Sequence, residues 1–149
     1  MNDLYNVSEV KLTYERNNKN RKKLKVNSSA KIYALMRYNW EQIEYRETFK
    51  ILLLDISKQA LGINTVSMGG LSDTTVDVRM ILQGALLANA CGIVCCHNHP
   101  SGNVKPSFED DIITLKIMEA CKTVGIELVD HLIIAQYGYY SYADEGRLK

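Results

Sequence analysis

The sequence has 149 residues, 46% of them hydrophobic, which is the size and composition of one ordinary globular domain. No run approaches about 18 apolar residues, and the first ten residues, MNDLYNVSEV, lack the basic, apolar and small-residue regions of a signal peptide. We therefore expect a cytoplasmic protein without a membrane segment, and the composition argues against a secreted disulfide scaffold.

Positive charge is concentrated near the N-terminus. Residues 1–37 carry nine Lys and Arg against three Asp and Glu, whereas residues 38–149 carry nine against fourteen. The excess lies mainly in RNNKNRKKLK, whose basic residues are Arg16, Lys19, Arg21, Lys22, Lys23 and Lys25. Such a run can hold nucleic-acid phosphates, or it can be a solvated linker. We therefore divide the chain into a basic N-terminal extension, residues 1–27, and a domain, residues 28–149.

The first half of this domain predicts two helices and a strand pair. Ser28 or Ser29 can cap a first helix, and the apolar residues that follow at helical spacing are Ile32, Leu35, Met36 and Trp40. The short apolar run TFKILLLDIS, residues 48–57, and GINTVSMGG, residues 62–70, predict two paired strands. Residues 78–90, VRMILQGALLANA, predict a second helix with a wide apolar face, despite the glycine at position 84.

The second half begins with a buried strand, CGIVCCHNH, residues 91–99, which Pro100 ends. A third helix is predicted from about Ser107, with Gly125 after its C-cap. Its apolar positions at helical period are Phe108, Ile112, Leu115, Met118, Cys121 and Val124. IELVDHLIIA and YYSYA predict the last strands, with a tight turn at QYG. Alternating strands and helices predict an α/β fold, one sheet with helices packed on its faces.

The segment CCHNHPSGNVKPSFEDD, residues 95–111, contains the candidate chemistry. Side chains alternate along a strand, so His97 and His99 lie on one face and can share a cation. A catalytic zinc ion usually takes three protein ligands and leaves a fourth position for water. Asp110, in the first turn of the third helix, is the best candidate for the third ligand. Cys95 shares the same face but lies about 6.6 Å further back along the strand, too far to join the same site.

Each of these features also has an explanation without a metal. Ser107 followed three residues later by Asp110 forms a variant of the capping box that starts many helices. Histidines at a strand end can simply donate hydrogen bonds to loop backbone. The four cysteines fit neither a zinc knuckle nor a disulfide framework, and buried thiols explain them.

The joint order of His, His, Ser and Asp resembles the JAMM, or MPN-plus, metalloprotease motif, in the version found in RadC-like JAB domains. The resemblance covers about residues 28–148 and includes RETFKILLLD, GALLANACGIVCCHNHPSGNVKPSFEDD and VDHLIIAQYGYYSYADEG. It implies a three-layer α/β sandwich with a mixed β-sheet flanked by helices. It also implies a Zn²⁺-dependent hydrolase that cleaves a peptide or isopeptide amide. The implied zinc ligands are His97, His99 and Asp110, Glu47 is the implied general base, and Ser107 helps to stabilise the oxyanion.

Three further features of the family comparison bear on function. Asp130 and His131 match a family Asp-His pair, which is either a structural hydrogen bond or a partner of a metal ligand. Full-length RadC-type chains carry an N-terminal helix-hairpin-helix region for DNA, and we find no such pattern here. VDVRM, residues 76–80, replaces the family's Pro-Arg-Glu at the second helix. The alternative function is a non-enzymatic role in DNA repair or DNA metabolism, with nucleic acid bound by the basic run of residues 16–25.

Overall fold

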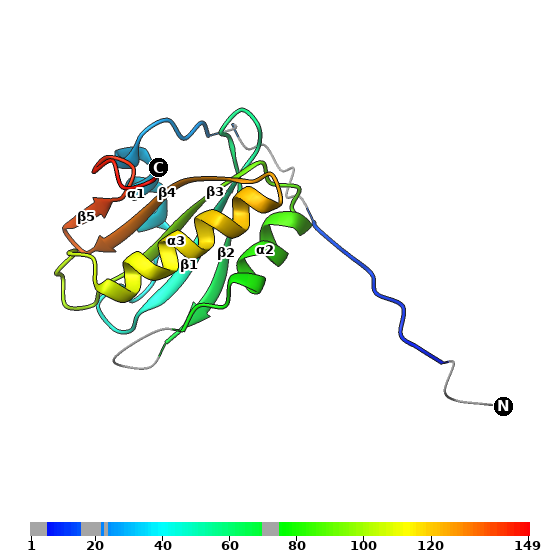
Figure 1. Cartoon of the computed structure of the whole chain (residues 1–149). Coiled ribbons are helices and arrows are strands. Elements are labelled where there is room, and N and C mark those ends of the chain that lie inside the picture. Colours follow the sequence, from blue (N-terminus) through cyan, green and yellow to red (C-terminus); the bar gives the residue numbers. More distant parts are fainter. Residues whose placement is uncertain (1–5, 16–21, 23, 70–74) are drawn as a thin grey trace.

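The computed structural model describes residues 6–15, 22, 24–69 and 75–149. Most of the basic run lies outside these residues, so the predicted nucleic-acid contacts of Arg16, Lys19, Arg21 and Lys23 have no structural description. The described segments form three helices and five strands in the predicted order (Figure 1). The elements are α1 (Ser29–Tyr38), β1 (Thr48–Leu54), β2 (Ala60–Met68), α2 (Val78–Leu87), β3 (Gly92–Asn98), α3 (Phe108–Thr123), β4 (Glu127–Ala135) and β5 (Gly138–Ser141).

The strands form one mixed sheet in the order β2-β1-β3-β4-β5. β3 and β4 are parallel and are joined through α3, whereas the other neighbouring strands are antiparallel. β3 is therefore the central strand, and all seven of its residues are buried. The carboxyl end of such a strand is where the loop to the next helix begins, which places residues 97–99 at an edge of the sheet.

Helices cover both faces of the sheet, which confirms the three-layer α/β sandwich. Figure 1 shows α2 and α3 on one face, where Ile81, Ala85, Ile117 and Cys121 pack on alternate residues of β1 and β3. On the opposite face, α1 packs Ile32 and Met36 on the intervening residues of the strands. Among the described residues no helix combines the length and hydropathy needed to cross a membrane.

Local sequence signals explain the helix ends. The Ser28 hydroxyl accepts a hydrogen bond from the Lys31 amide at the start of α1, and the Asp77 carboxylate accepts one from the Arg79 amide at the start of α2. Gly125 follows the C-cap of α3 with φ of 74°, a conformation that favours glycine. Gly84 is explained by packing, because a Cβ there would lie 3.2 Å from Asn64 Oδ1 and 3.4 Å from Ile51 Cδ1. The glycine lets α2 approach the sheet closely.

The buried face of α3 differs from the one that its apolar period suggests. Of the six apolar positions, Phe108, Ile112, Leu115 and Val124 are exposed. The residues that α3 buries are Asp110, Thr114, Ile117 and Cys121. The spacing of 110, 114, 117 and 121 is equally helical, so two faces of this helix carry a regular pattern and the sheet selects the one with polar residues. This choice turns Asp110 toward the end of β3.

Candidate functional site

His97 and His99 point their Nε2 atoms at each other across 3.1 Å. His97 lies near the end of β3, and His99 continues the pairing through its amide, which donates to the carbonyl of Ile134. The Nδ1 atom of His99 lies 2.7 Å from the carbonyl oxygen of Asn103, which can only accept, so Nδ1 carries the proton. In the neutral ring this tautomer leaves the Nε2 lone pair of His99 directed at the space between the two rings, whereas in the charged ring Nε2 donates to the Asp110 carboxylate.

Asp110 brings a carboxylate to the same space. Its Oδ1 lies 3.0 Å from His97 Nε2, and its Oδ2 lies 3.3 Å from His99 Nε2. Burial alone would raise the pKa of Asp110, but the hydrogen bonds with His97 and His99 outweigh it and hold the pKa well below the usual range. The predicted cluster of two imidazoles and one carboxylate is therefore present, with an ionised carboxylate.

The capping box at the start of α3 is present as well. Ser107 Oγ accepts a hydrogen bond of 3.1 Å from the Asp110 amide, and Asp110 Oδ2 accepts one of 2.8 Å from the Ser107 amide. The two interpretations of this segment are thus compatible, because one carboxylate both starts the helix and faces the histidines. The Ser107 hydroxyl serves here as a cap acceptor, and its role at an oxyanion stays a prediction.

Glu47 joins the group from a distant part of the chain. It precedes β1, and its carboxylate Oε1 lies 3.9 Å from His97 Nε2, further than that of Asp110. Ligand atoms of Glu47, His97, His99 and Asp110 all lie within 4.8 Å of one another. Glu47, His97 and Asp110 also line a hollow of about 140 Å³. The group contains no cysteine, and Cys95 instead packs in the core below it.

His131 supports His97 from behind. His97 Nδ1 lies 2.8 Å from His131 Nε2, and His131 Nδ1 lies 2.6 Å from Thr114 Oγ1, whose hydroxyl donates to the Asp110 carbonyl. Because that hydroxyl proton is used, Thr114 must accept from His131 Nδ1, and His131 Nε2 must then accept from His97 Nδ1. When the His97 ring is neutral, this one-directional chain leaves its Nε2 lone pair facing the cluster, and a proton on Nε2 is donated to the Asp110 carboxylate. Burial, reinforced by His97, lowers the pKa of His131 well below its ordinary value, so the ring is neutral.

Asp130 has a different role from its neighbour. Its carboxylate accepts hydrogen bonds from the Ser141 hydroxyl at 2.6 Å, the His131 amide at 2.7 Å and the Ala143 amide at 3.0 Å. These bonds tie β4 to β5 and to the turn that follows. The Asp-His pair therefore combines both interpretations. Asp130 makes structural hydrogen bonds, and His131 contacts the candidate metal ligand His97.

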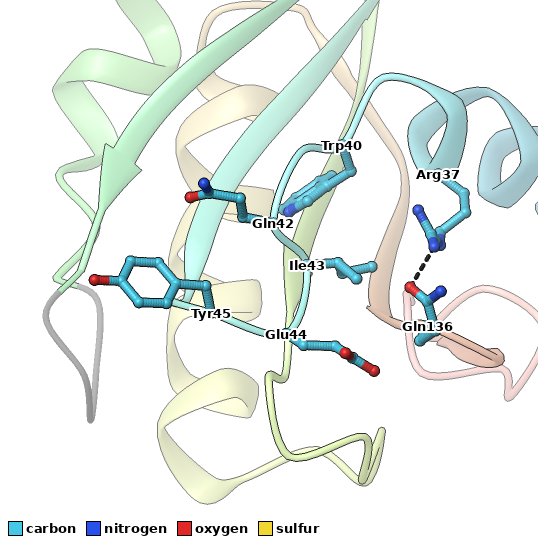
Figure 2. A pocket seen from close by; sticks show the side chains of 7 residues that line it. All are labelled: Arg37, Trp40, Gln42, Ile43, Glu44, Tyr45 and Gln136. Carbon is cyan, nitrogen blue, oxygen red and sulfur yellow. Dashed lines mark hydrogen bonds between the residues drawn. The ribbon is translucent and has the colours of Figure 1, made fainter.

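A larger hollow, of about 530 Å³, lies beside the segment that leads to Glu47 (Figure 2). Its lining residues are Arg37, Trp40, Gln42, Ile43, Glu44, Tyr45 and Gln136, and Arg37 donates a hydrogen bond to the Gln136 side chain. It contains none of the histidines and none of the four residues of the cluster. Size alone therefore does not identify the site, and the smaller hollow with converging ligand atoms is the candidate metal centre.

The donor set fits a zinc ion. Zinc in proteins binds imidazole nitrogen and carboxylate oxygen, and its histidine ligands usually donate their other ring N–H to a backbone carbonyl or another side chain. His99 and His97 do so through Asn103 and His131, and both Nε2 atoms converge with the Asp110 carboxylate. The group can thus bind a metal ion through three protein ligands.

Comparison with known proteins places this chain in a family. The family model described as RadC-like JAB domain matches residues 26–147. A UPF0758 protein of Thermotoga maritima is 38% identical over 125 residues, 83% of this chain and 55% of that protein. One of Methanosarcina acetivorans is 40% identical over 83% of this chain and 54% of its own length. The chain spans about half the length of these curated relatives. The chain therefore belongs to the family of RadC-like JAB domains.

Proposed function

We propose that this protein is a zinc-dependent hydrolase that cleaves a peptide or isopeptide amide bond. The observation that carries the proposal is the convergence of Glu47, His97, His99 and Asp110 within 4.8 Å, from three separate segments of the chain. A purely structural zinc site closes its coordination with four protein ligands, whereas a catalytic one has three and keeps a position open. Two histidines and one close carboxylate match the second arrangement.

In this proposal the three close ligands and Glu47 have separate tasks. His97, His99 and Asp110 hold the ion, which when bound lowers the pKa of water to about 7 and polarises a carbonyl. Glu47, whose carboxylate is further from His97 Nε2 than that of Asp110, is the general base. Its carboxylate accepts the proton of the attacking water and returns it to the leaving amine. Ser107, at the start of α3, donates its hydroxyl proton to the developing oxyanion in this proposal once substrate is present.

Metal content tests the site itself. Protein purified without chelators should contain close to one zinc ion per chain, and Asp110→Ala should lose it. Glu119→Ala is the matched control, because Glu119 is an exposed acid on the same helix and lies outside the cluster. Circular dichroism checks that α3 survives the loss of its capping box. Unchanged zinc in Asp110→Ala would remove this carboxylate from the site.

Turnover tests the hydrolase. Zinc-loaded protein is incubated with a panel of unfolded proteins and isopeptide-linked peptides, and new termini are detected by mass spectrometry. Glu47→Gln keeps size and hydrogen-bonding capacity but removes the base, so it should retain zinc and fold while cleavage falls by about 10²–10⁴-fold. Equal cleavage by Glu47→Gln and by the unmodified protein would refute the assigned role of Glu47.

A further inference from the structure

Asn98 lies between the two candidate histidine ligands but points to the opposite face of β3, as alternation along the strand requires. It is completely buried, on the α1 side of the sheet. The hydrogen bonds of its side chain go to one short segment of backbone. Its Oδ1 accepts from the Thr48 amide at 2.7 Å, and its Nδ2 donates to the carbonyls of Ile43 at 2.6 Å and Arg46 at 2.9 Å.

That segment, residues 43–48, contains Glu47. It belongs to the connection between the end of α1 and the start of β1, and residues 39–47 contain neither helix nor strand. The connection includes Gln42 with φ of 53° and a turn in which the Tyr45 amide donates to the Gln42 carbonyl. Backbone groups here have no ladder partner of the kind that strands supply, so other groups must satisfy them. The Asn98 side chain supplies a partner for two carbonyls of this connection, those of Ile43 and Arg46, and for the Thr48 amide at the start of β1.

Other contacts also hold the segment. The pairing of β1 with β3 begins at Phe49, opposite His97, and the Glu47 carboxylate itself lies 3.9 Å from His97 Nε2. The Ile43 side chain is buried in the core on the α1 side and borders the large hollow of Figure 2. The Glu47 carbonyl accepts from the Gly69 amide, which joins it to the end of β2. Asn98 is different because its backbone is covalently continuous with His97 and His99. A movement of β3 at this point would move the ligands and the Glu47 segment together.

We propose that Asn98 is a positioning residue that sets the Glu47 carboxylate relative to His97, His99 and Asp110. The consequence for catalysis rests on the proposed function, whereas the positioning itself does not. The amide is suited to this task because it offers two donors and one acceptor in one plane, which matches two carbonyls and one amide. An aspartate of the same shape can accept from Thr48 but sets an oxygen against the carbonyls of Ile43 and Arg46.

The experiment uses two variants of the full chain and one control. Asn98→Ala removes all three hydrogen bonds, and Asn98→Asp keeps the shape and the bond from Thr48. Tyr33→Phe is the control, because the Tyr33 hydroxyl donates to two backbone carbonyls, those of Ala135 and Gln136, at the β4–β5 turn. Its loss removes side-chain-to-backbone bonds of the same kind far along the chain from Glu47.

Amide hydrogen exchange gives the first readout. In Asn98→Ala the Thr48 and Tyr45 amides should exchange about tenfold faster, in line with the loss of a buried hydrogen bond. In Asn98→Asp the Thr48 amide should keep its protection while the Tyr45 amide loses it. Tyr33→Phe should leave both amides unchanged. Unaltered exchange at Tyr45 in both Asn98 variants would overturn the proposal, as would failure of both variants to fold, which would make Asn98 a determinant of the fold only.

Position relative to the metal gives the second readout. Each protein is loaded with Co²⁺ alone, and pseudocontact shifts of backbone amides are measured by NMR. The shifts of Arg46, Glu47 and Thr48 should change in both Asn98 variants and stay constant in Tyr33→Phe, while metal stoichiometry stays at one. Constant shifts in the Asn98 variants would contradict positioning. If the unmodified chain binds no Co²⁺ or Zn²⁺, the proposed function fails, and hydrogen exchange still decides the role of Asn98.

Discussion

His131→Phe should weaken zinc binding by about ten- to a hundredfold without unfolding the protein. Phenylalanine keeps a ring that can stack on Tyr142, where the centroids are now 5.1 Å apart with an interplanar angle of 12°. It removes the acceptor that lies 2.8 Å from His97 Nδ1. Binding a cation through Nε2 forces the remaining proton of His97 onto Nδ1, so the buried, unpaired N–H penalises the metal-bound form. Such a group costs about 1–3 kcal/mol, which agrees with the expected loss of affinity.

Competition with a chromophoric chelator at fixed pH measures this change. Thr114→Val is the control within the same chain of hydrogen bonds, because it removes the far partner of His131 but leaves Nε2 to accept from His97. Its loss of zinc affinity should therefore be smaller than that of His131→Phe. A folded His131→Phe protein with unchanged zinc affinity would show that His97 does not depend on His131 for its tautomer or orientation.

Two further predictions concern thiols and pH. A thiol reagent at pH 8 should modify the exposed Cys91 quickly and the other three cysteines only after denaturation. Cys95, Cys96 and Cys121 are buried, and burial raises the pKa of Cys121 to about 11. The fast phase should be absent in Cys91→Ser, and a second fast-reacting thiol would contradict the predicted burial of the other three. In metal-free protein the pKa of Asp110 is lowered, so this carboxylate stabilises the fold above its ordinary pKa of 3.8, and that stability is lost as pH falls. The pKa of His99 is raised, because the Asp110 carboxylate outweighs the opposite effect of burial. His99 therefore stabilises the fold below its ordinary pKa of 6.5, and that stability is lost as pH rises. The melting temperature should accordingly be highest between pH 3.8 and pH 6.5 and fall on either side of this range. Both decreases in melting temperature should be smaller in Asp110→Asn.

The sequence predicted the order of the elements because local signals agreed with the fold at nearly every step. Ser28, Ser107 and Gly125 mark helix ends in the places where the structure has them. The face of α3 could not be predicted in the same way. Its exposed side carries Phe108, Ile112 and Leu115, and its buried side carries Asp110 and Thr114, so hydrophobicity alone favours the wrong side. Packing on the sheet and the contact of Thr114 with His131 determine which side of α3 is buried, and the periodicity of the helix shows neither.

The site shows the same division between local and long-range information. His97, His99 and Asp110 lie on one strand, loop and helix, and alternation with helix capping was enough to bring them together. Glu47 is fifty residues away, and only the resemblance to a known family identified it. A physical signal exists in the pairing of β1 with β3, where Phe49 lies opposite His97 and thereby places Glu47 beside the histidines. Register of that kind is not readable from either strand alone.

The Ser107–Asp110 capping box makes the candidate metal centre depend on the first turn of α3. Helix ends open locally far more often than the core unfolds, and here opening of a single turn would carry one of the three ligands away. Ligand release would then require no global unfolding, and the rate of metal exchange would follow the rate at which this turn frays. A bound cation would in return suppress the fraying by mass action. For a metal bound at this candidate site, two hydrogen bonds between residues only three apart in sequence would then limit its lifetime.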